Sequence, residues 1–182
     1  MIEMDKRQLR KHIKSQVALL SDEQKLKESN NVFSHIEKTS IFKQSRNIMI
    51  FASLKDEIPT HHIIERWAKN KNIFLPRVSG DDIEVIRYTP GSLKQGSFNI
   101  LEPTGDDITS PDIIDLIILP GVAFDKKGNR CGRGKGFYDR FLSNTKATTI
   151  AVCFDCQLVD SLPVEPHDIP AQNIVTNSYK TI

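Results

Sequence analysis

The segment NRCGRGKGFYDRF, from Asn129 to Phe141, concentrates residues that can bind an anion. Gly132, Gly134 and Gly136 occupy every second position, with basic side chains between them. Glycine lets the backbone approach an anion closely and turn successive N–H groups toward it, and arginine can hold two phosphate oxygens at once. The segment therefore predicts a binding site for a phosphate-bearing ligand.

Known phosphate motifs do not account for this segment. A Walker loop requires G-x-x-x-x-G-K-[ST], but Gly128 and Gly134 are separated by five residues, and Gly136 stands where a magnesium-binding hydroxyl belongs. A dinucleotide fingerprint requires G-x-G-x-x-G, and Phe137 takes the place of its third glycine. The physics behind both motifs still applies, because a helix that begins near Gly136 adds the partial positive charge of its N-terminus.

Two other interpretations of the segment compete with an anion site. Residues 135–137 mimic part of an RRM core, but Tyr138 and Asp139 fall where a small residue and a stacking aromatic belong, so RNA binding is not expected. The simpler alternative is a solvated basic turn after a core strand. Asp139 would repel a phosphate unless it binds Mg²⁺ or caps the helix.

The 182-residue chain has the composition of one soluble globular domain, with 38% hydrophobic and 26% charged residues. Its net charge of +2 argues against a dedicated nucleic-acid or membrane binder. No run of about 18 apolar residues is present, and the N-terminus is charged where a secretory signal needs an apolar centre. Three cysteines, an odd number, favour a reducing compartment, so we expect a cytoplasmic protein without nucleic-acid or membrane partners.

Helical and strand patterns alternate along the chain. Apolar residues at helical spacing, and Ser21 and Thr60 as helix caps, indicate helices, whereas short apolar runs bounded by proline or glycine indicate strands. Helices are expected at residues 5–20, 22–38, 61–70 and 136–143, and strands at residues 47–53, 72–76, 82–88, 113–121, 149–154 and 173–176. The alternation predicts an α/β fold, a single domain over residues 1–182 with a mainly parallel open sheet flanked by helices on both faces.

The predicted sheet places the basic segment at a functional position. Residues 113–121 are almost continuously apolar and end in Pro120 and Gly121, which is typical of a strand buried on both faces. Pro76 is expected to stop the strand that begins at residue 72. Ligands of open α/β sheets bind beyond the carboxyl ends of the strands. The basic segment follows the most apolar strand directly, and it is therefore the leading candidate for the site.

Several stretches of this chain resemble one known family. Residues 119–142, LPGVAFDKKGNRCGRGKGFYDRFL, closely resemble the signature of the 5-formyltetrahydrofolate cyclo-ligase family, approximately PG-x-AFD-x-x-G-x-RLG-x-GxGYYDR-x-L. KRQLR at 6–10 resembles its N-terminal element, and FASLKDEIPT at 51–60 resembles a strand-to-helix segment that carries an acidic residue. LP at 162–163 and HD at 167–168 match a C-terminal LPxExHD pattern. The motifs occur in the family's order over nearly the whole chain.

The resemblance implies an enzyme that closes the ring of 5-formyltetrahydrofolate to 5,10-methenyltetrahydrofolate, with ATP and Mg²⁺, and releases ADP and phosphate. In this chemistry the formyl oxygen takes the γ-phosphoryl group, N10 of the folate attacks the same carbon, and phosphate leaves. No protein nucleophile is needed, because the enzyme aligns the reactants and neutralises developing charge. The resemblance also implies a monomer whose partners are two small molecules, a reduced folate and ATP.

The family's functional positions carry over residue by residue. The resemblance implies ATP contacts at Lys6, Arg7, Gln8, Leu9, Arg10, Arg130, Cys131, Gly132, Arg133, Gly134, Lys135, Gly136, Phe137 and Tyr138. It implies folate contacts at Ala52, Glu57, Arg133, Gly134, Lys135, Gly136 and Phe137, and magnesium ligands at Asp139 and Asp168. We hypothesise that Arg133 and Lys135 stabilise the transferring phosphoryl group, and that Glu57 accepts hydrogen bonds from the pterin.

Two residues depart from the family pattern. Cys131 replaces the usual leucine of the RLG element, and a small apolar cysteine can fill the same core position. Phe137 replaces the first tyrosine of GYYD, which keeps a flat ring and loses its hydroxyl. Alternative functions stay open at this point: a folate-binding regulator without turnover, or a nucleotide- or phosphosugar-binding protein with the same fold.

Other residues suggest chemistry without a complete motif. Cys153 and Cys156 form a CxxC, but they lie at the end of a predicted strand, so core thiols are favoured over a redox pair. A zinc site that added Cys131 and His167 would match no known spacing. The His61-His62 pair begins a predicted helix near the expected site; both are interpreted as capping or solvated residues, with substrate contact as the alternative.

Overall fold

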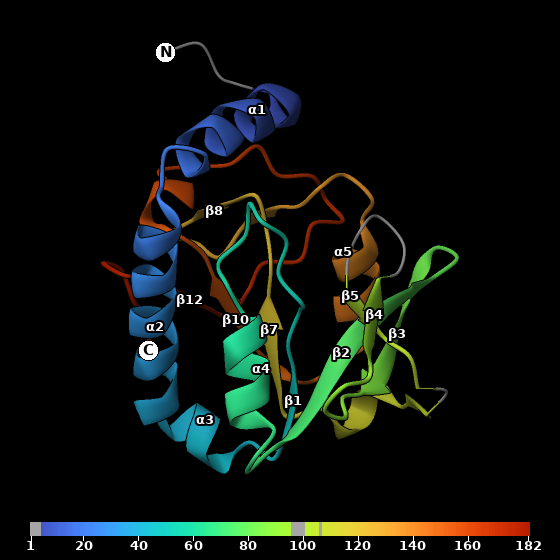
Figure 1. The fold of residues 1–182 in the computed structure, drawn as a ribbon. Coiled ribbons are helices and arrows are strands. Elements are labelled where there is room, and N and C mark those ends of the chain that lie inside the picture. The colour runs from blue at the N-terminus through green and yellow to red at the C-terminus, as the bar shows by residue number, and fades with distance from the viewer. Residues whose placement is uncertain (1–4, 96–100, 106) are drawn as a thin grey trace.

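The computed structural model describes residues 5–95, 101–105 and 107–182. Its centre is a seven-stranded sheet in the order β12-β10-β7-β1-β2-β3-β6 (Figure 1). The strands of this sheet are β1 Asn47–Met49, β2 Asn72–Ser79, β3 Asp82–Arg87, β6 Ile108–Thr109, β7 Leu116–Leu119, β10 Thr148–Val152 and β12 Asn173–Val175. The α-helices are α1 Lys6–Val17, α2 Asp22–Lys38, α3 Ser40–Gln44, α4 His61–Trp67 and α5 Phe137–Leu142.

The sheet is mainly parallel, as predicted. Strands β12, β10, β7, β1 and β2 pair in parallel, and β2–β3 and β3–β6 are antiparallel pairs at one edge. Strand β7 lies between β1 and β10, and all four of its residues are buried. The run 113–121 is therefore the doubly buried strand that its apolar sequence predicts, although the strand itself covers only its centre.

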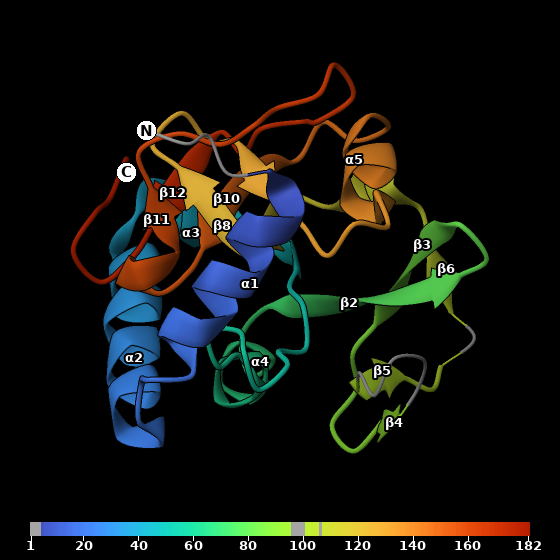
Figure 2. The same ribbon diagram turned by 90° about the horizontal axis from the view of Figure 1, so that it is seen from above.

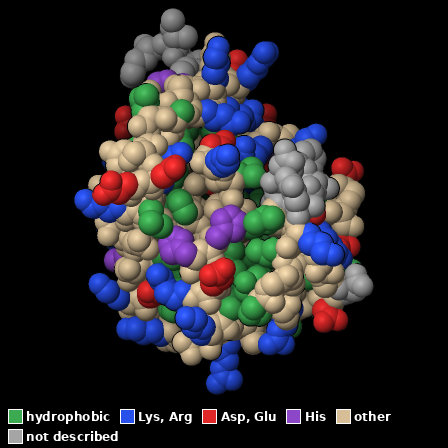
Figure 3. All heavy atoms as spheres, in the orientation of Figure 1, with side chains coloured by type: hydrophobic (Ala, Val, Ile, Leu, Met, Phe, Trp, Pro, Cys, Tyr) green, Lys and Arg blue, Asp and Glu red, His purple; other side chains and the backbone are tan. Residues whose placement is uncertain are grey.

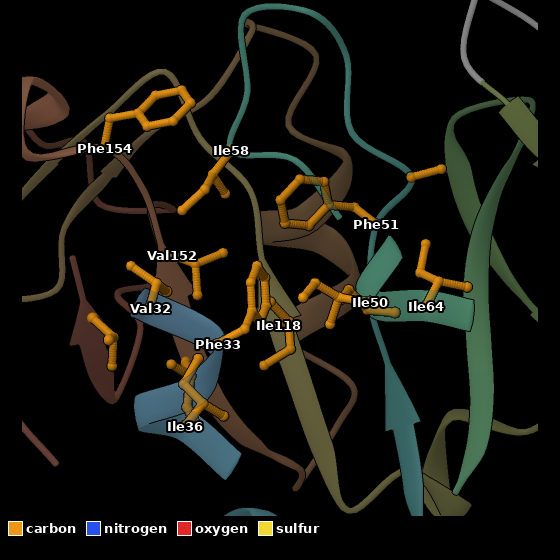
Figure 4. Close-up of a cluster of buried hydrophobic side chains, with 14 of the residues drawn as sticks. Val32, Phe33, Ile36, Ile50, Phe51, Ile58, Ile64, Ile118, Val152 and Phe154 are labelled. Carbon is orange, nitrogen blue, oxygen red and sulfur yellow. The ribbon is translucent and has the colours of Figure 1, made fainter. Parts of the chain in front are cut away.

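Helices cover both faces of the sheet, and Figure 2 shows α2 and α4 on one side and α5 on the other. Side chains alternate between two buried clusters along β1, β7 and β10. Ile48, Ile118 and Val152 belong to the cluster that contains α2 and α4 residues, whereas Met49 and Ile117 belong to the cluster with α5. Figure 4 shows the first cluster, in which α2 side chains meet those of the strands. This period of two is the reason why continuous apolar runs form these strands.

Helix capping follows the predicted chemistry in one case and not in the other. Ser21 accepts from the backbone N–H of Gln24, whose side chain accepts from the Ser21 N–H, so the capping box opens α2. Thr60 stands at the N-cap of α4, but its hydroxyl donates to the Phe51 carbonyl and accepts from Ser53 N–H instead of capping the helix. The prediction that the Thr60 side chain caps α4 is wrong, because its hydroxyl instead forms hydrogen bonds with the segment that follows β1.

Element boundaries differ from expectation at several points. The expected strand 47–53 ends at Met49, and the helix expected to reach residue 70 ends at Trp67. Pro76 does not stop β2, which continues to Ser79. Proline lacks an N–H group and is therefore tolerated in a strand where no neighbouring strand needs that donor. Pro76 meets this condition on the β1 side, because Phe74 is the last β2 residue with a partner on β1. The short helix α3 was not expected.

The basic segment begins in a small hairpin. Strands β8 (Ala123–Asp125) and β9 (Arg130–Cys131) pair antiparallel, and β11 (Leu158–Val159) joins β8 in parallel. The buried Asp125 closes the turn, because its Oδ1 accepts from the backbone N–H groups of Lys127 and Asn129. The residues after β9 then run without regular structure to α5.

Candidate active site

A pocket of about 840 Å³ opens at the carboxyl ends of β1 and β7, where the fold predicts a site. The pocket is lined by Phe51 and Ala52, which follow β1, and by Pro120 and Gly121, which follow β7. The N-terminal part of α1 and the segment before α5 supply charged walls. On the face drawn in Figure 3, Lys and Arg side chains gather below α1, and hydrophobic side chains are exposed farther down, toward α4 and β2.

Most of the predicted site residues line this one pocket. They are Lys6, Arg7, Arg10, Ala52, Glu57, Arg130, Gly132, Arg133, Gly134, Lys135, Gly136, Phe137, Tyr138, Asp139 and Asp168. They come from α1, the segment after β1, the segment 130–139 and the C-terminal loop. The structure therefore brings together residues that are up to about 160 positions apart in the sequence.

Three predicted ATP contacts do not line the pocket. Leu9 is 4% exposed and Cys131 is 2% exposed, and both pack in the hydrophobic core. Gln8 closes the capping box of α1 with Asp5. Because side chains on a helix point in different directions, only one face of α1 reaches the pocket. Cys131 fills the core position that we expected for it, and burial raises the pKa of its thiol.

Lys6 is held at the pocket wall by two carboxylates. Its Nζ lies 2.7 Å from Asp168 Oδ2 and 3.0 Å from Glu165 Oε2. Burial alone would lower the pKa of Lys6, but the hydrogen bonds and charges of Asp168 and Glu165 outweigh it and raise that pKa. Burial would raise the pKa of Asp168, but the hydrogen bond from Lys6 and the backbone N–H of Glu165 lower it. Both groups are charged at neutral pH.

Arg10, one turn beyond Lys6 on α1, reaches the glycine segment. Its Nε donates to the Gly132 carbonyl at 2.7 Å, and its guanidinium lies against Gly134, where an added Cβ would stand 3.6 Å from Nη2. Gly134 has a φ of 96° and Gly136 a φ of 66°, which is the left-handed region that glycine adopts without strain. The glycines therefore bring the backbone close to a basic side chain of α1.

Arg130 and Asp139 form an ion pair at the base of the pocket. Arg130 Nη2 lies 2.8 Å from Asp139 Oδ1, and the Arg130 side chain is 4% exposed. Asp139 Oδ1 also accepts from the backbone N–H of Ile169. The Arg130 guanidinium lies 5.5 Å from the ring centroid of Tyr138, in cation–π geometry. The Asp139 carboxylate, unexpected in a phosphate site, thus neutralises a buried cation of that site.

Arg133 and Lys135, the two predicted catalytic cations, differ in their surroundings. Arg133 Nη2 lies 2.6 Å from Asp56 Oδ1 and 3.0 Å from Glu57 Oε1. Burial would lower the pKa of Arg133, but the hydrogen bond that it donates to Asp56 and the charge of Glu57 raise it. Lys135 is exposed, and its ammonium makes no hydrogen bond or ion pair with the residues that the structure describes. Lys135 is therefore available to an incoming anion.

Asp139 and Asp168, the predicted magnesium ligands, line the same pocket and retain free oxygens. Asp139 accepts from Arg130 through Oδ1, and Asp168 accepts from Lys6 and from the Glu165 N–H through Oδ2. The second oxygen of each carboxylate, Asp139 Oδ2 and Asp168 Oδ1, forms no hydrogen bond within the described chain. Glu165, His167 and Asp168 also place ligand atoms within 4.8 Å of one another. Carboxylate oxygens are the ligands that Mg²⁺ prefers, with further places taken by phosphate and water. The donor set therefore fits this ion.

An apolar wall of the pocket was not found from the sequence. It is formed by side chains of β2 and β3 and of the segments that follow β1 and β7, namely Phe51, Leu54, Pro76, Val78, Ile83 and Pro120, and Glu102 lies beside it. Proximity to strand ends could have indicated Phe51 and Pro120. Val78, Ile83 and Glu102 carry no local signal. The antiparallel pair β2–β3 brings the first two to the site, and Glu102 lies on β5 (Leu101–Pro103), whose separate ribbon with β4 (Leu93–Gln95) contacts β2.

The remaining candidates do not join the pocket. His61 contacts the Ser53 carbonyl and His62 contacts Asn30 Oδ1, so both histidines bind within the protein. Cys153 is buried and Cys156 half-buried, both thiols are free, and burial raises the pKa of each. A thiol with a raised pKa is a poor nucleophile, which favours the interpretation as core thiols.

Fold and pocket together define the class of protein: a single-domain α/β protein whose pocket is lined by basic side chains of α1 and of the segment 130–136 and by apolar side chains of β2 and β3. The chain belongs to the 5-formyltetrahydrofolate cyclo-ligase family, whose sequence model matches residues 2–177. It is 33% identical to the 5-formyltetrahydrofolate cyclo-ligase of Mus musculus, over 93% of this chain and 92% of the relative. The enzyme of that name from Haemophilus influenzae is also 33% identical, over 93% and 96% of the two chains.

A solved structure agrees with this family. The NMR structure of Aquifex aeolicus 5,10-methenyltetrahydrofolate synthetase matches with a TM-score of 0.89 and 34% identity, over 97% of this chain and 92% of that one. The chain is therefore an enzyme, a cyclo-ligase of folate one-carbon metabolism. Within the described residues, no helix is both long and apolar enough to cross a membrane.

Proposed function

We propose that this protein converts 5-formyltetrahydrofolate and ATP to 5,10-methenyltetrahydrofolate, ADP and phosphate. The observation that carries the proposal is the composition of its pocket. Basic side chains of α1 and of the segment 130–136 share one cavity of about 840 Å³ with an apolar wall. A triphosphate needs the first environment and a flat reduced pterin needs the second, and the reaction requires both ligands at one place.

The proposed reaction requires the protein to align the two substrates and to neutralise the charge that develops. The formyl oxygen attacks the γ-phosphorus, and the bond to ADP breaks. N10 then attacks the activated carbon and loses its proton, and the carbon–oxygen bond breaks with release of phosphate. In this proposal Lys135 and Arg133 stabilise the charge on the transferring group, while Lys6 and Arg10 hold the phosphate tail from α1. None of these steps needs a covalent bond to the protein.

Magnesium would be held by Asp139 and Asp168, through the oxygens that they do not use for Arg130 and Lys6. The ion would neutralise phosphate charge and orient the triphosphate. We further propose that the protein acts as a monomer in the cytoplasm, where its free thiols stay reduced.

One assay tests this function. Purified protein is mixed with MgATP and 5-formyltetrahydrofolate, and the absorbance of the methenyl product is followed. We expect absorbance to increase only when ATP and Mg²⁺ are both present, and EDTA to stop the increase until excess Mg²⁺ is added. Binding of 5-formyltetrahydrofolate without turnover would instead identify a folate-binding regulator. Absence of folate binding would leave an anion-binding protein and end the proposal.

A further inference from the structure

Arg140, in the last turn of α5, extends its guanidinium back toward the start of that helix. Its Cζ lies 5.4 Å from the ring centroid of Phe137, in cation–π geometry. A Cβ added to Gly136 would stand 2.8 Å from its Nη1. Side chains on a helix lean toward its N-terminus, so Arg140 can cover a residue one turn earlier. The guanidinium therefore packs on the bare backbone of Gly136 and on the ring of Phe137.

The same guanidinium is anchored to the hairpin that β2 and β3 form. Nε and Nη2 of Arg140 both donate to the backbone carbonyl of Asp81, Nε at 3.0 Å. Asp81 lies in the turn between Ser79, the last residue of β2, and Asp82, the first residue of β3. Helix α5 also contacts β3 (Figure 2). Because the guanidinium is planar and rigid, two donors to one oxygen fix its orientation.

Both elements that Arg140 joins are walls of the pocket. Phe137 lines the pocket from the start of α5, whereas Val78 and Ile83, which are paired across β2 and β3, line it from the hairpin. Arg140 itself is exposed, and it is not among the described residues that line the pocket. Arg140 therefore supports the Phe137 ring from outside the cavity.

A simpler role for Arg140 would be to stabilise the C-terminal carbonyl groups of α5, as basic residues in a last turn often do. Its guanidinium lies at the opposite end of the helix, against Gly136 and Phe137, so this role does not account for its position. Phe137 has no hydroxyl group through which a hydrogen bond could hold its ring. A side chain that is already fixed loses less conformational entropy when a ligand binds to it.

We propose that Arg140 is a positioning residue for folate binding, which holds the Phe137 ring in a fixed place relative to Val78 and Ile83. The flat ring of the reduced folate would then bind against a preformed aromatic surface. This inference rests on the proposed function, because it concerns the same substrate. Arg140 touches neither substrate in this proposal and acts only through Phe137.

Steady-state kinetics test the proposal. Arg140→Ala should raise KM for 5-formyltetrahydrofolate by about 5- to 10-fold, because an unsupported ring binds its partner less well. Both kcat and KM for ATP should stay within about twofold, since the basic residues of the pocket are unchanged. Arg140→Lys has a single nitrogen to share between Phe137 and Asp81, so its KM for the folate should rise less than that of Arg140→Ala.

A double-mutant cycle shows whether Arg140 acts through Phe137. In the Phe137→Leu protein the ring is absent, so adding Arg140→Ala should change KM for the folate by less than about twofold. A purely structural role of Arg140 would instead give the same factor in both backgrounds. Equal factors would therefore overturn the proposal.

Arg87→Ala is the matched control, because it removes another exposed arginine, at the end of β3, that is also not among the described residues of the pocket lining. Its kinetic constants should stay within about twofold of those of the unchanged protein, and melting temperatures show that each variant is folded in the assay. An unchanged folate KM in Arg140→Ala, or equal changes in both KM values and kcat, would contradict the role of Arg140 and leave the proposed function intact. If the unchanged protein forms no methenyl product, the proposed function fails, and this inference fails with it.

Discussion

Arg133 and Glu57 are joined across the pocket, with Nη2 of the arginine 3.0 Å from Oε1 of the glutamate. We hypothesise that the first residue stabilises the transferring phosphoryl group, and the family resemblance assigns the second to the folate. The structure places them in one ion pair, together with Asp56. The contact shows that the two halves of the proposed site are adjacent, and that in this state part of the cationic charge is neutralised by the chain itself.

The ion pair leads to a first prediction, on Arg133→Ala. We expect kcat to fall by about 10²- to 10³-fold, because a charged donor to the transferring phosphoryl group is lost. Stability should change by about 1 kcal/mol or less, since the pair is partly exposed. Asp56→Ala is the matched control, because it removes the Arg133–Asp56 ion pair from the other side and leaves the arginine in place, still paired with Glu57. Equal activity losses in the two variants would show that only the ion pair matters.

The second prediction concerns Lys135, whose ammonium has no partner in the described part of the chain. Lys135→Ala should reduce kcat by a similar factor of about 10²–10³ and leave the melting temperature unchanged. Lys127→Ala removes the same charge from the turn just before the basic segment, outside the pocket lining, and should keep its activity. A Lys135→Ala enzyme with unchanged kcat would remove Lys135 from the mechanism.

The third prediction is the cost of a side chain at Gly128. This residue has a φ of 89°, and a Cβ added to it would overlap the carbonyl oxygen of Ala171, whose backbone N–H donates to the Gly128 carbonyl. We expect Gly128→Ala to destabilise the protein by about 3 kcal/mol or more in urea unfolding. Gly91→Ala has a similar φ of 81° and no atom within 4 Å, so it should cost only about 1 kcal/mol. Equal costs would mean that the turn is free to move away from Ala171.

The fourth prediction concerns how the free energy of unfolding changes at low pH. The pKa of Asp168 is lowered in the folded protein, so its contribution is complete above the ordinary carboxyl pKa of about 3.9 and is lost as the pH falls through the lower folded value. The free energy of unfolding is measured without metal from pH 7 to pH 2. The difference between the unchanged protein and Asp168→Asn should be constant above about pH 5 and shrink below about pH 4. A constant difference down to pH 2 would contradict the shift.

The fifth prediction separates the structural role of Asp139 from its proposed metal role. Asp139→Ala leaves the buried Arg130 without its counter-charge and should cost about 3–5 kcal/mol of stability. Asp139→Asn keeps an oxygen for Arg130 and for the Ile169 N–H, so it should cost less in unfolding experiments. The asparagine enzyme should nevertheless need a higher Mg²⁺ concentration for half-maximal activity. An unchanged Mg²⁺ requirement would exclude Asp139 as a ligand.

Local sequence patterns are enough to predict much of the fold and of the candidate site. Apolar runs such as 113–121 predict buried parallel strands because a strand covered on both faces has no polar side. The Ser21 box predicts the start of α2 because both of its hydrogen bonds lie within three residues. The alternating glycines and basic residues of 129–141 indicate an anion site, and family motifs name most of the residues that line it.

Only the tertiary structure decided which side chains meet. Leu9 and Cys131 lie within the predicted ATP motifs, yet the packing of α1 and β9 turns them into the core. Glu102 carries no motif and reaches the pocket because β5 packs against β2. The pairing of Arg133 with Glu57 joins residues 76 positions apart. Sequence patterns report the interactions of near neighbours along the chain, whereas the charge balance of this pocket arises from contacts that exist only after the sheet has formed.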